Sequence, residues 1–153
     1  MQIGKIFKKI NKKFKFHKFS ELKFDSLKCK RGDIFFAIKG TKKNGNKFIK
    51  DAINNGAKTI ISNLKKEGFK KDVLYLSSQN PRKLLAETAS IIYKKKPKNL
   101  ISITGTNGKS SVANFFIQIL NQCNKTAASI GTLGVNSKDV NFPLNNTTLD
   151  PLS

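Results

Sequence analysis

The stretch that most constrains the fold runs from Ile101 to Ser111 and reads Ile-Ser-Ile-Thr-Gly-Thr-Asn-Gly-Lys-Ser-Ser. It predicts a buried strand, then a glycine-rich turn carrying one lysine, then a helix that begins with hydroxyl residues. Glycines let backbone amides turn towards an anion, and the start of a helix adds the positive end of its dipole. In such a loop Lys109 can reach the outer phosphates of a nucleotide, and the Ser110 hydroxyl can hold Mg²⁺.

The residues after this loop are typical of an amphipathic helix over 110–122. Its apolar side chains recur at helical spacing on one face: Val112, Phe115, Phe116, Ile119 and Leu120. The alternative is a glycine-containing turn between a strand and a helix that binds nothing. Strand 100–104, glycines, lysine, hydroxyl pair and helix all stand in the order of a phosphate site, and this order favours nucleotide binding.

The charge of the chain suggests a second class of function. A formal net charge of +21 is typical of proteins that bind nucleic acid, because cations release counterions from phosphate backbones. However, only Arg31 and Arg82 are arginines, whereas base-reading proteins favour arginine. The lysines are spread along the whole chain, as expected for solvated surfaces encoded by A/T-rich codons. We therefore expect no nucleic-acid partner, and keep a basic module that binds nucleic acid or an anionic membrane as the alternative.

The cysteine, histidine and hydropathy patterns limit the cellular compartments in which this chain is expected to work. Cys29 and Cys123 lie far apart without a CxxC spacing, which is typical of reduced, structural cysteines in a cytosolic protein. His17 is the single histidine, so a histidine-rich metal site within this chain is excluded. No apolar run is long enough to span a bilayer. These observations predict a cytoplasmic location without stable membrane insertion.

The part before the loop alternates predicted strands and helices, which indicates an α/β domain. Strands are expected at 34–38, 58–62 and 73–76, and helices at 48–56 and from Pro81 onward, capped by Asn80. The residues expected to face inward from these two helices are Phe48, Ile49, Ala52, Ile53, Leu84, Leu85, Thr88, Ala89 and Ile92. Residues 1–16 predict an amphipathic helix that docks on this domain through Ile3, Ile6, Phe7, Ile10 and Phe14. The polar stretch Lys94–Asn99 contains Pro97 and predicts a domain boundary.

The phosphate loop carries a resemblance to a known family. The general loop pattern has a glycine where this chain has Ile103, but the tighter form from Thr104 to Ser110 resembles the loop of the Mur ligases. Folylpolyglutamate and cyanophycin synthetases share a similar loop and remain an alternative. The resemblance implies ATP as a cofactor, with Mg²⁺ on Ser110. The implied ATP-binding residues are Gly105, Thr106, Asn107, Gly108, Lys109, Ser110 and Ser111.

A second resemblance lies nearer the start of the chain. Asp25-Ser26, the Arg31–Ala37 stretch and the later Gly40, Gly45, Phe48-Ile49 and Gly56-Ala57 are similar to the N-terminal domain of two Mur ligases. In that family the segment holds the uridine end of a UDP-N-acetylmuramoyl substrate. Carried over, the nucleotide contacts and the loop around it fall on Phe24, Ser26, Thr41, Lys42 and Lys43. The chain departs from the family pattern at Leu27, usually Arg, at Asn44, usually Asp, and at Asn46, usually His.

A third resemblance narrows the branch of the family. Gly131-Thr132-Leu133-Gly134 followed by Asn145-Asn146-Thr147-Thr148-Leu149-Asp150 is similar to the Mur ligases that add the third peptide residue. By this resemblance Asn146, Thr147 and Thr148 contact the muramoyl-peptide substrate, and Leu149 replaces a usual proline. The folylpolyglutamate and cyanophycin branch gives no reason for Gly131–Gly134 or for the uridine-type segment.

Together these resemblances imply an α/β chain of two domains. Residues 1–96 would be a small UDP-substrate-binding domain, and 97–153 the truncated start of a P-loop-type ATPase domain with a parallel sheet. The implied enzyme is a monomeric, ATP-dependent amide ligase. It adds a diamino acid, meso-diaminopimelate or lysine, to UDP-N-acetylmuramoyl-L-alanyl-D-glutamate through an acyl phosphate. No counterpart of the family's C-terminal domain is present, so we expect this chain to hold no complete catalytic set and to be inactive alone.

Overall fold

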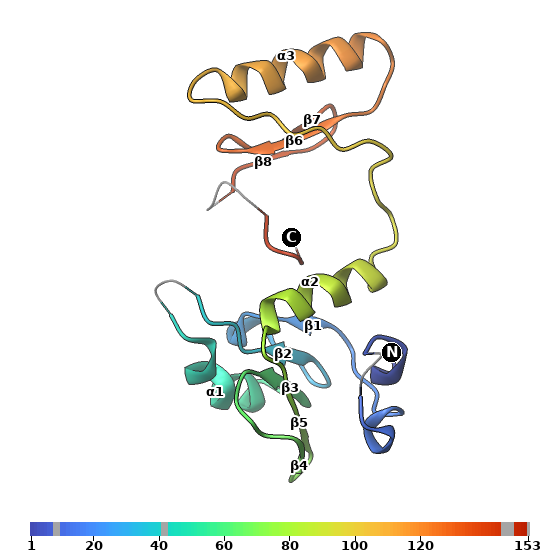
Figure 1. Cartoon of the computed structure of the whole chain (residues 1–153), viewed down its shortest axis with the longest axis vertical. Helices are drawn as coiled ribbons and strands as arrows, with labels where there is room; N and C mark the ends of the chain where they lie inside the picture. Colours follow the sequence, from blue (N-terminus) through green and yellow to red (C-terminus); the bar gives the residue numbers. More distant parts are fainter. Residues whose placement is uncertain (8–9, 41–42, 145–148, 153) are drawn as a thin grey trace. The chain divides into compact units, whose positions relative to one another are not determined.

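The computed structural model describes residues 1–7, 10–40, 43–144 and 149–152. By their internal contacts these residues form two compact units, Met1–Lys94 and Lys95–Pro151 (Figure 1). Each unit is described by itself. Among the described residues, no helix is both long enough and apolar enough to cross a membrane.

The first unit is built on a five-stranded sheet in the order β1-β2-β3-β5-β4. The strands β1, β2, β3 and β5 run parallel, and β4 pairs antiparallel with β5 at one edge. Their bounds are Leu22–Lys23 (β1), Ile34–Phe36 (β2), Thr59–Ser62 (β3), Gly68–Lys70 (β4) and Val73–Ser77 (β5). The predicted strands at 34–38, 58–62 and 73–76 are confirmed, whereas β1 and β4 were not predicted. The α/β class is confirmed.

Both faces of this sheet are covered, because successive side chains of a strand point to opposite faces. Ile34 and Phe36 join the core cluster of helix α2 (Pro81–Ile92), and Phe35 joins the cluster of helix α1 (Ile49–Asn54). Leu85 on α2 and Ala52 on α1 are fully buried. The inward faces predicted for the two helices are therefore confirmed, with the short 3-10 turn Gly45–Phe48 leading into α1.

The start of α2 follows its sequence signals. The Asn80 side chain accepts a hydrogen bond from the amide of Lys83 at 3.0 Å, and Pro81 occupies the first helical position, where its missing N–H costs nothing. Thr88 is also buried and donates its hydroxyl to the Leu84 carbonyl at 2.7 Å, which satisfies this polar group inside the core.

The N-terminal segment docks as predicted, but it is not one helix. It forms two 3-10 turns, Ile3–Lys5 and Lys12–Phe14, and folds back on itself. The amide of Ile3 donates to the carbonyl of His17 at 2.9 Å, a long-range pairing that helical periodicity cannot reveal. The predicted docking residues Ile3, Ile6 and Phe7 are nonetheless buried, and Ile10 and Phe14 pack against the same core.

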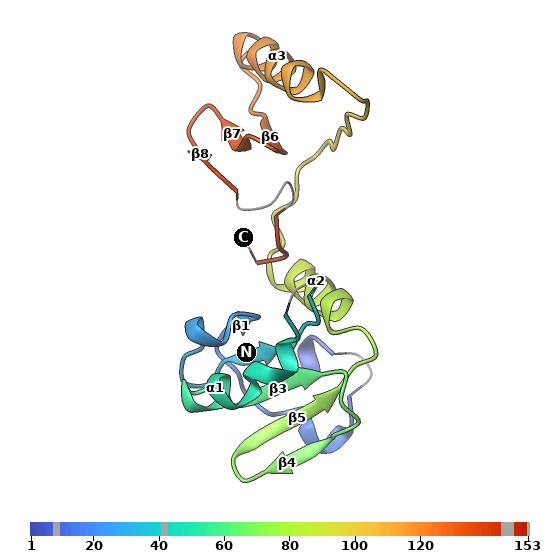
Figure 2. The ribbon, with the colours of Figure 1, turned by 90° about the vertical axis from the view of Figure 1, so that its left-hand side faces the viewer.

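The second unit pairs one helix with a small sheet. Helix α3 (Lys109–Gln122) lies along a three-stranded antiparallel sheet in the order β6-β7-β8 (Figure 2). The bounds of these strands are Ala128–Gly131 (β6), Gly134–Ser137 (β7) and Asn141–Phe142 (β8). The predicted helix over 110–122 is confirmed.

Two expectations for this unit are wrong. Residues 100–104 form no strand with any described residue, since β6 pairs antiparallel with β7 instead. The predicted apolar face of α3 is largely exposed, with Phe115 61% and Ile119 58% accessible. The helix rests instead on the neighbouring stripe around Ile117, which is 5% exposed. An apolar stripe predicts burial only where another layer covers it, and in the described residues this sheet covers one side of α3.

Candidate functional site

The candidate phosphate loop enters α3 through a left-handed glycine. Gly108 caps α3 with a φ of 75°, a left-handed conformation that side chains with a Cβ rarely adopt. A Cβ at Gly108 would meet nothing within 4 Å, so the backbone angle, rather than crowding, requires glycine. Among the described side chains none caps the start of α3. The first amides of the helix therefore have no side-chain partner among the described residues and can bind an anion.

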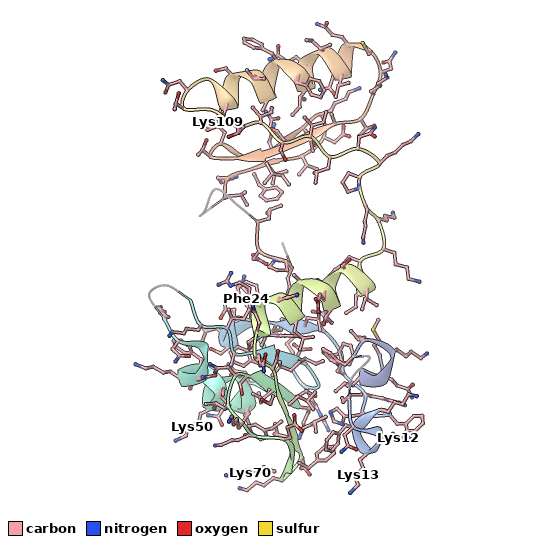
Figure 3. The ribbon with its side chains drawn as sticks, viewed as in Figure 1. Lys12, Lys13, Phe24, Lys50, Lys70 and Lys109 are labelled. Atoms are coloured by element: carbon pink, nitrogen blue, oxygen red, sulfur yellow. The ribbon has the colours of Figure 1, made fainter. Side chains whose placement is uncertain are left out.

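Lys109 lies over this loop (Figure 3). Its ammonium donates to the carbonyl of Gly105 and, at 3.1 Å, to the carbonyl of Thr106. All residues from Gly105 to Ser111 are exposed. The positive charge is therefore held next to the helix start, and a phosphate could replace the two carbonyls as its partner.

Ser110 presents an exposed hydroxyl beside the loop. Its Oγ lies 3.2 Å from the Oγ1 of Thr132, which belongs to the turn between β6 and β7. A hydroxyl oxygen is a hard ligand that fits Mg²⁺. In the described ranges no cluster of three or more His, Cys, Asp or Glu could hold a metal ion. Sequence reasoning missed Thr132 as a neighbour of the loop, although the Gly131–Gly134 motif marked its position.

The described candidate uridine residues follow the carboxyl ends of two neighbouring strands. β1 and β2 are adjacent and parallel, so the segments that follow them meet at the same edge of the sheet. Phe24 comes directly after β1 and is 41% exposed, whereas Ser26 is 6% exposed. The Ser26 carbonyl accepts a hydrogen bond from the Asn55 side chain at 2.9 Å, which ties this segment to the end of α1. The Phe24 side chain is therefore accessible, whereas Ser26 is mostly covered.

The loop after β2 carries Lys43, the third described residue among the predicted substrate contacts. Lys43 is exposed, and its carbonyl accepts the amide of Gly40 at 2.8 Å. The structure thus places Phe24, Ser26 and Lys43 on segments that leave neighbouring strands. The other substrate residues that we predicted, Thr41, Lys42, Asn146, Thr147 and Thr148, lie outside the described residues.

Two departures from the family pattern have local explanations. Asn44 accepts the amide of Asn46 at 3.1 Å, so it caps the turn before α1 as an aspartate would. Asn46 donates its side-chain amide to the Asn63 oxygen at 2.8 Å, but its own buried oxygen has no partner among the described groups. The third departure, Leu27, is 82% exposed and breaks no packing.

Asp33 organises the turn between β1 and β2. It is 2% exposed, and its two carboxylate oxygens accept the amides of Glu21 at 3.1 Å and Lys30 at 2.9 Å. Burial, followed by the nearby Asp33 and Asp25 carboxylates, raises the pKa of the Cys29 thiol to about 11. Cys29 is therefore protonated at neutral pH and serves as a core residue, as its sequence context predicts.

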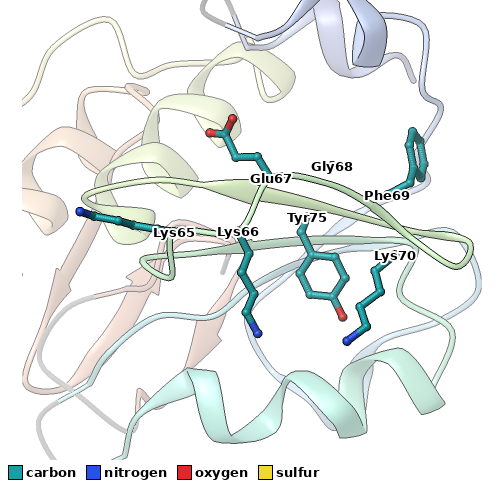
Figure 4. A pocket seen from close by; sticks show the side chains of 7 residues that line it. All are labelled: Lys65, Lys66, Glu67, Gly68, Phe69, Lys70 and Tyr75. Atoms are coloured by element: carbon teal, nitrogen blue, oxygen red, sulfur yellow. The ribbon is translucent and has the colours of Figure 1, made fainter.

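A hollow that sequence reasoning did not predict opens beside the edge strand β4, with a cavity volume of about 330 Å³ (Figure 4). Gly68 pairs opposite Tyr75, so no side chain covers this ring from the facing strand. The side chains of Lys66, Lys70 and Tyr75 extend to one side of the hairpin, and Glu67 to the other (Figure 4). None of the residues that line it belongs to the predicted sites.

The sequence of this chain is similar to proteins of one family. The family described as "Mur ligase family, catalytic domain" matches residues 18–93. A relative from Rickettsia prowazekii (strain Madrid E), named UDP-N-acetylmuramoyl-L-alanyl-D-glutamate--2,6-diaminopimelate ligase, is 43% identical over 94% of this chain. A protein of the same name from Mesorhizobium japonicum is 38% identical over 84% of this chain.

Solved structures agree on the fold. A structure of a UDP-N-acetylmuramoyl-L-alanyl-D-glutamate--2,6-diaminopimelate ligase matches 99% of this chain with a TM-score of 0.73 and 24% identity. The MurF ligase of Thermotoga maritima, solved in complex with ADP, matches 69% of this chain with a TM-score of 0.51 and 24% identity.

The match covers most of this chain but only a part of the length of each relative. The chain spans 30% of the length of the Rickettsia prowazekii relative and 27% of the Mesorhizobium japonicum relative. It spans 31% of the length of the first solved structure and 24% of the second. Within that span the similarity includes both the sheet edge of the first unit and the phosphate loop. The chain belongs to the Mur ligase family.

Proposed function

We propose that this chain provides two binding elements of an ATP-dependent amide ligase of peptidoglycan synthesis. Residues 1–96 form the domain that holds the uridine end of the substrate, and 97–153 form the start of the ATP-binding domain. The reaction joins a diamino acid to UDP-N-acetylmuramoyl-L-alanyl-D-glutamate. The observation that carries this proposal is the candidate phosphate loop, in which Lys109 lies next to a helix start that no described side chain caps.

In this function the loop residues neutralise and orient phosphate. Phosphoryl transfer depends mainly on positioning and on balancing charge. The amides of Gly105–Ser111 and the Lys109 ammonium would bind the β- and γ-phosphates, and the exposed Ser110 hydroxyl would hold Mg²⁺. When bound, Mg²⁺ supplies further neutralisation of the phosphate oxygens.

The first unit would fix the other end of the same substrate. The exposed ring of Phe24 is suited to stack on a nucleotide base, and Lys43 stands on the neighbouring loop. Thr41 and Lys42 are proposed to complete that loop, and Asn146, Thr147 and Thr148 to contact the peptide end. Several relatives are named for 2,6-diaminopimelate, which supports this diamino acid as the second substrate. We propose a monomer that works in the cytoplasm, without nucleic acid.

The direct test is nucleotide affinity. Titration of ATP with Mg²⁺ should give binding to the wild-type chain and roughly 10-fold to 100-fold weaker binding to Lys109→Ala, since a hydrogen bond to a charged group contributes about 1.5–3 kcal/mol. Lys125→Ala removes another exposed lysine of the same unit and should bind as the wild type does. Equal affinity for Lys109→Ala and wild type would refute the role of Lys109.

Two further measurements separate the rival functions. In thermal-shift assays UDP-N-acetylmuramoyl-L-alanyl-D-glutamate should stabilise the chain and a folate should not; stabilisation by the folate alone would favour the folylpolyglutamate branch. A basic nucleic-acid or membrane module would bind generic duplex or anionic vesicles without needing Lys109. Such binding should vanish as salt is raised to physiological strength, and its persistence there would favour the basic module.

A further inference from the structure

The Gly131–Gly134 motif has no role in the function proposed above, yet the structure places it against the phosphate loop. It forms the turn from β6 to β7, in which Gly131 pairs with Gly134. Gly134 has a φ of 95°, and a Cβ there would collide with the backbone of Phe142 and Pro143. Leu133 is 75% exposed, so burial does not hold the turn. Its shape therefore depends on Gly134.

This turn presents one hydroxyl to the start of α3. The Thr132 Oγ1 lies 3.2 Å from the Ser110 Oγ, a bond between residues 22 positions apart. Helix α3, which carries Ser110, also packs on β6, the strand that ends just before Thr132, and Ile117 of α3 is 5% exposed. The hydroxyl pair is thus held by tertiary structure rather than by local sequence. A β-branched threonine also has few side-chain rotamers, which narrows the position of its oxygen.

The chemistry of a hydroxyl ligand explains what this neighbour can do. A serine hydroxyl has one proton and two lone pairs. When a lone pair faces a cation, the proton must point elsewhere and needs an acceptor. Either oxygen of the pair can donate in the absence of a cation. With a cation on one lone pair of Ser110, donation from Ser110 to Thr132 gives the Ser110 proton an acceptor and leaves neither lone pair of Ser110 occupied by Thr132.

We propose that Thr132 is a positioning residue that accepts the Ser110 proton and so orients the Ser110 hydroxyl towards Mg²⁺. This inference rests on the proposed function and assigns a role to the Gly131–Gly134 motif. It predicts that Thr132 affects the contribution of Mg²⁺ to nucleotide binding rather than nucleotide binding itself.

The test compares ATP affinity in Mg²⁺ with ATP affinity in EDTA. In Thr132→Val the affinity in Mg²⁺ divided by the affinity in EDTA should fall roughly twofold to tenfold, which is the effect of one hydrogen bond. The affinity in EDTA itself should not change. Thr132→Ser keeps the hydroxyl and should keep the wild-type ratio. Thr126→Val removes another exposed threonine hydroxyl of this unit and should change neither affinity.

A double-mutant cycle isolates the pair. Once Ser110→Ala has removed the metal ligand, adding Thr132→Val should cause no further loss of the Mg²⁺ effect. Should Thr132→Val disturb the hairpin, the comparison of Thr132→Ser with Thr132→Ala still isolates the hydroxyl. The inference is overturned if the variants without the hydroxyl keep the wild-type ratio, or if affinity falls equally in Mg²⁺ and EDTA. A wild-type chain that binds no ATP refutes the proposed function and this inference together.

Discussion

The two units of this chain differ in how far they enclose their own side chains. The first unit covers both faces of its sheet, and nearly all described buried apolar residues belong to it. Among the described residues of the second unit, Ile117 is the only apolar side chain that is buried. The candidate phosphate loop is exposed throughout.

This difference matches the two kinds of binding that we propose. In the first unit a closed core fixes the ends of parallel strands, and the candidate uridine residues follow those ends. In the second unit the candidate phosphate contacts come from backbone amides, Lys109 and Ser110, which depend on a glycine conformation and a helix start. Substitutions should therefore act through packing in the first unit and through local backbone geometry in the second.

The largest contrast is expected for phenylalanine in the two units. Phe36 is fully buried and Phe115 is 61% exposed. Phe36→Ala should lower the free energy of unfolding of the first unit by about 3–5 kcal/mol, because it leaves a cavity. Phe115→Ala should change the stability of the second unit by no more than about 0.5 kcal/mol. Urea unfolding followed by residue-resolved NMR measures both. A similar loss for the two variants would show that α3 is covered in solution.

A buried carboxylate gives the next contrast. Asp33 accepts two backbone amides and is 2% exposed, whereas the side chain of Asp72 is 91% exposed and lies 4.0 Å from Lys58. Asp33→Ala should destabilise the first unit by about 1–3 kcal/mol, because two amides lose their acceptor. Asp72→Ala removes the same charge and should have almost no effect. Chemical denaturation of both variants checks this, and equal losses would mean that net charge, not the turn, matters.

Sequence patterns predicted the first unit well where the core decides the structure. The strands and helices with continuous apolar stripes were found, including the Asn80–Pro81 start of α2. Two short strands, β1 and β4, were missed because two or three residues show no periodicity. The N-terminal helix was wrong because the segment is held by distant pairings, such as Ile3 with His17. The apolar residues of that segment still identified the face that docks.

The candidate sites likewise contain features that local sequence predicts and contacts that depend on tertiary packing. The motif predicted the turn from its glycines and helix α3 from the spacing of its apolar residues, and both depend on local sequence. It could not reveal that Thr132 lies beside Ser110, because that contact depends on how α3 packs on β6. The strand at 100–104 failed for a related reason: an apolar run becomes a strand only with a hydrogen-bonding neighbour. The hollow between Lys66 and Lys70 is also a product of strand pairing, with Gly68 opposite Tyr75.

Glycine substitutions sharpen the comparison within the second unit. Gly108 needs a left-handed φ of 75°, while Gly131 has no positive φ and nothing within 4 Å of an added Cβ. Gly108→Ala should destabilise the start of α3 by about 1–2 kcal/mol. Gly131→Ala should be close to neutral. Amide hydrogen exchange in the first turns of α3 measures the difference. Unchanged protection in Gly108→Ala would contradict the requirement for glycine at this position.

The smallest expected effect is a pH dependence confined to the first unit, which contains His17. This ring lies with its Nε2 3.1 Å from the Thr59 hydroxyl, and its edge contacts Phe69 with the ring centres 5.5 Å apart. Burial lowers the pKa of His17 below its ordinary value of 6.5, and a hydrogen bond with the Lys58 backbone acts in the opposite direction. The unfolded chain therefore takes up a proton at a higher pH than the folded chain does.

This order of protonation decides whether stability rises or falls with pH. The contribution of His17 to stability is fully present above pH 6.5 and is lost as the pH falls towards the lowered pKa of the folded state. Glu21 does not interfere in that range, because its hydrogen bond with Lys23 lowers the pKa of the Glu21 carboxyl below 4.5. His17→Gln keeps an amide that can reach Thr59 but does not titrate. Its stability should be flat between pH 6.5 and 5, whereas the wild type should weaken, and the second unit should show no change in either protein. Residue-resolved NMR denaturation across this pH range tests the difference, and equal slopes for wild type and variant would remove His17 from the docking of the N-terminal segment.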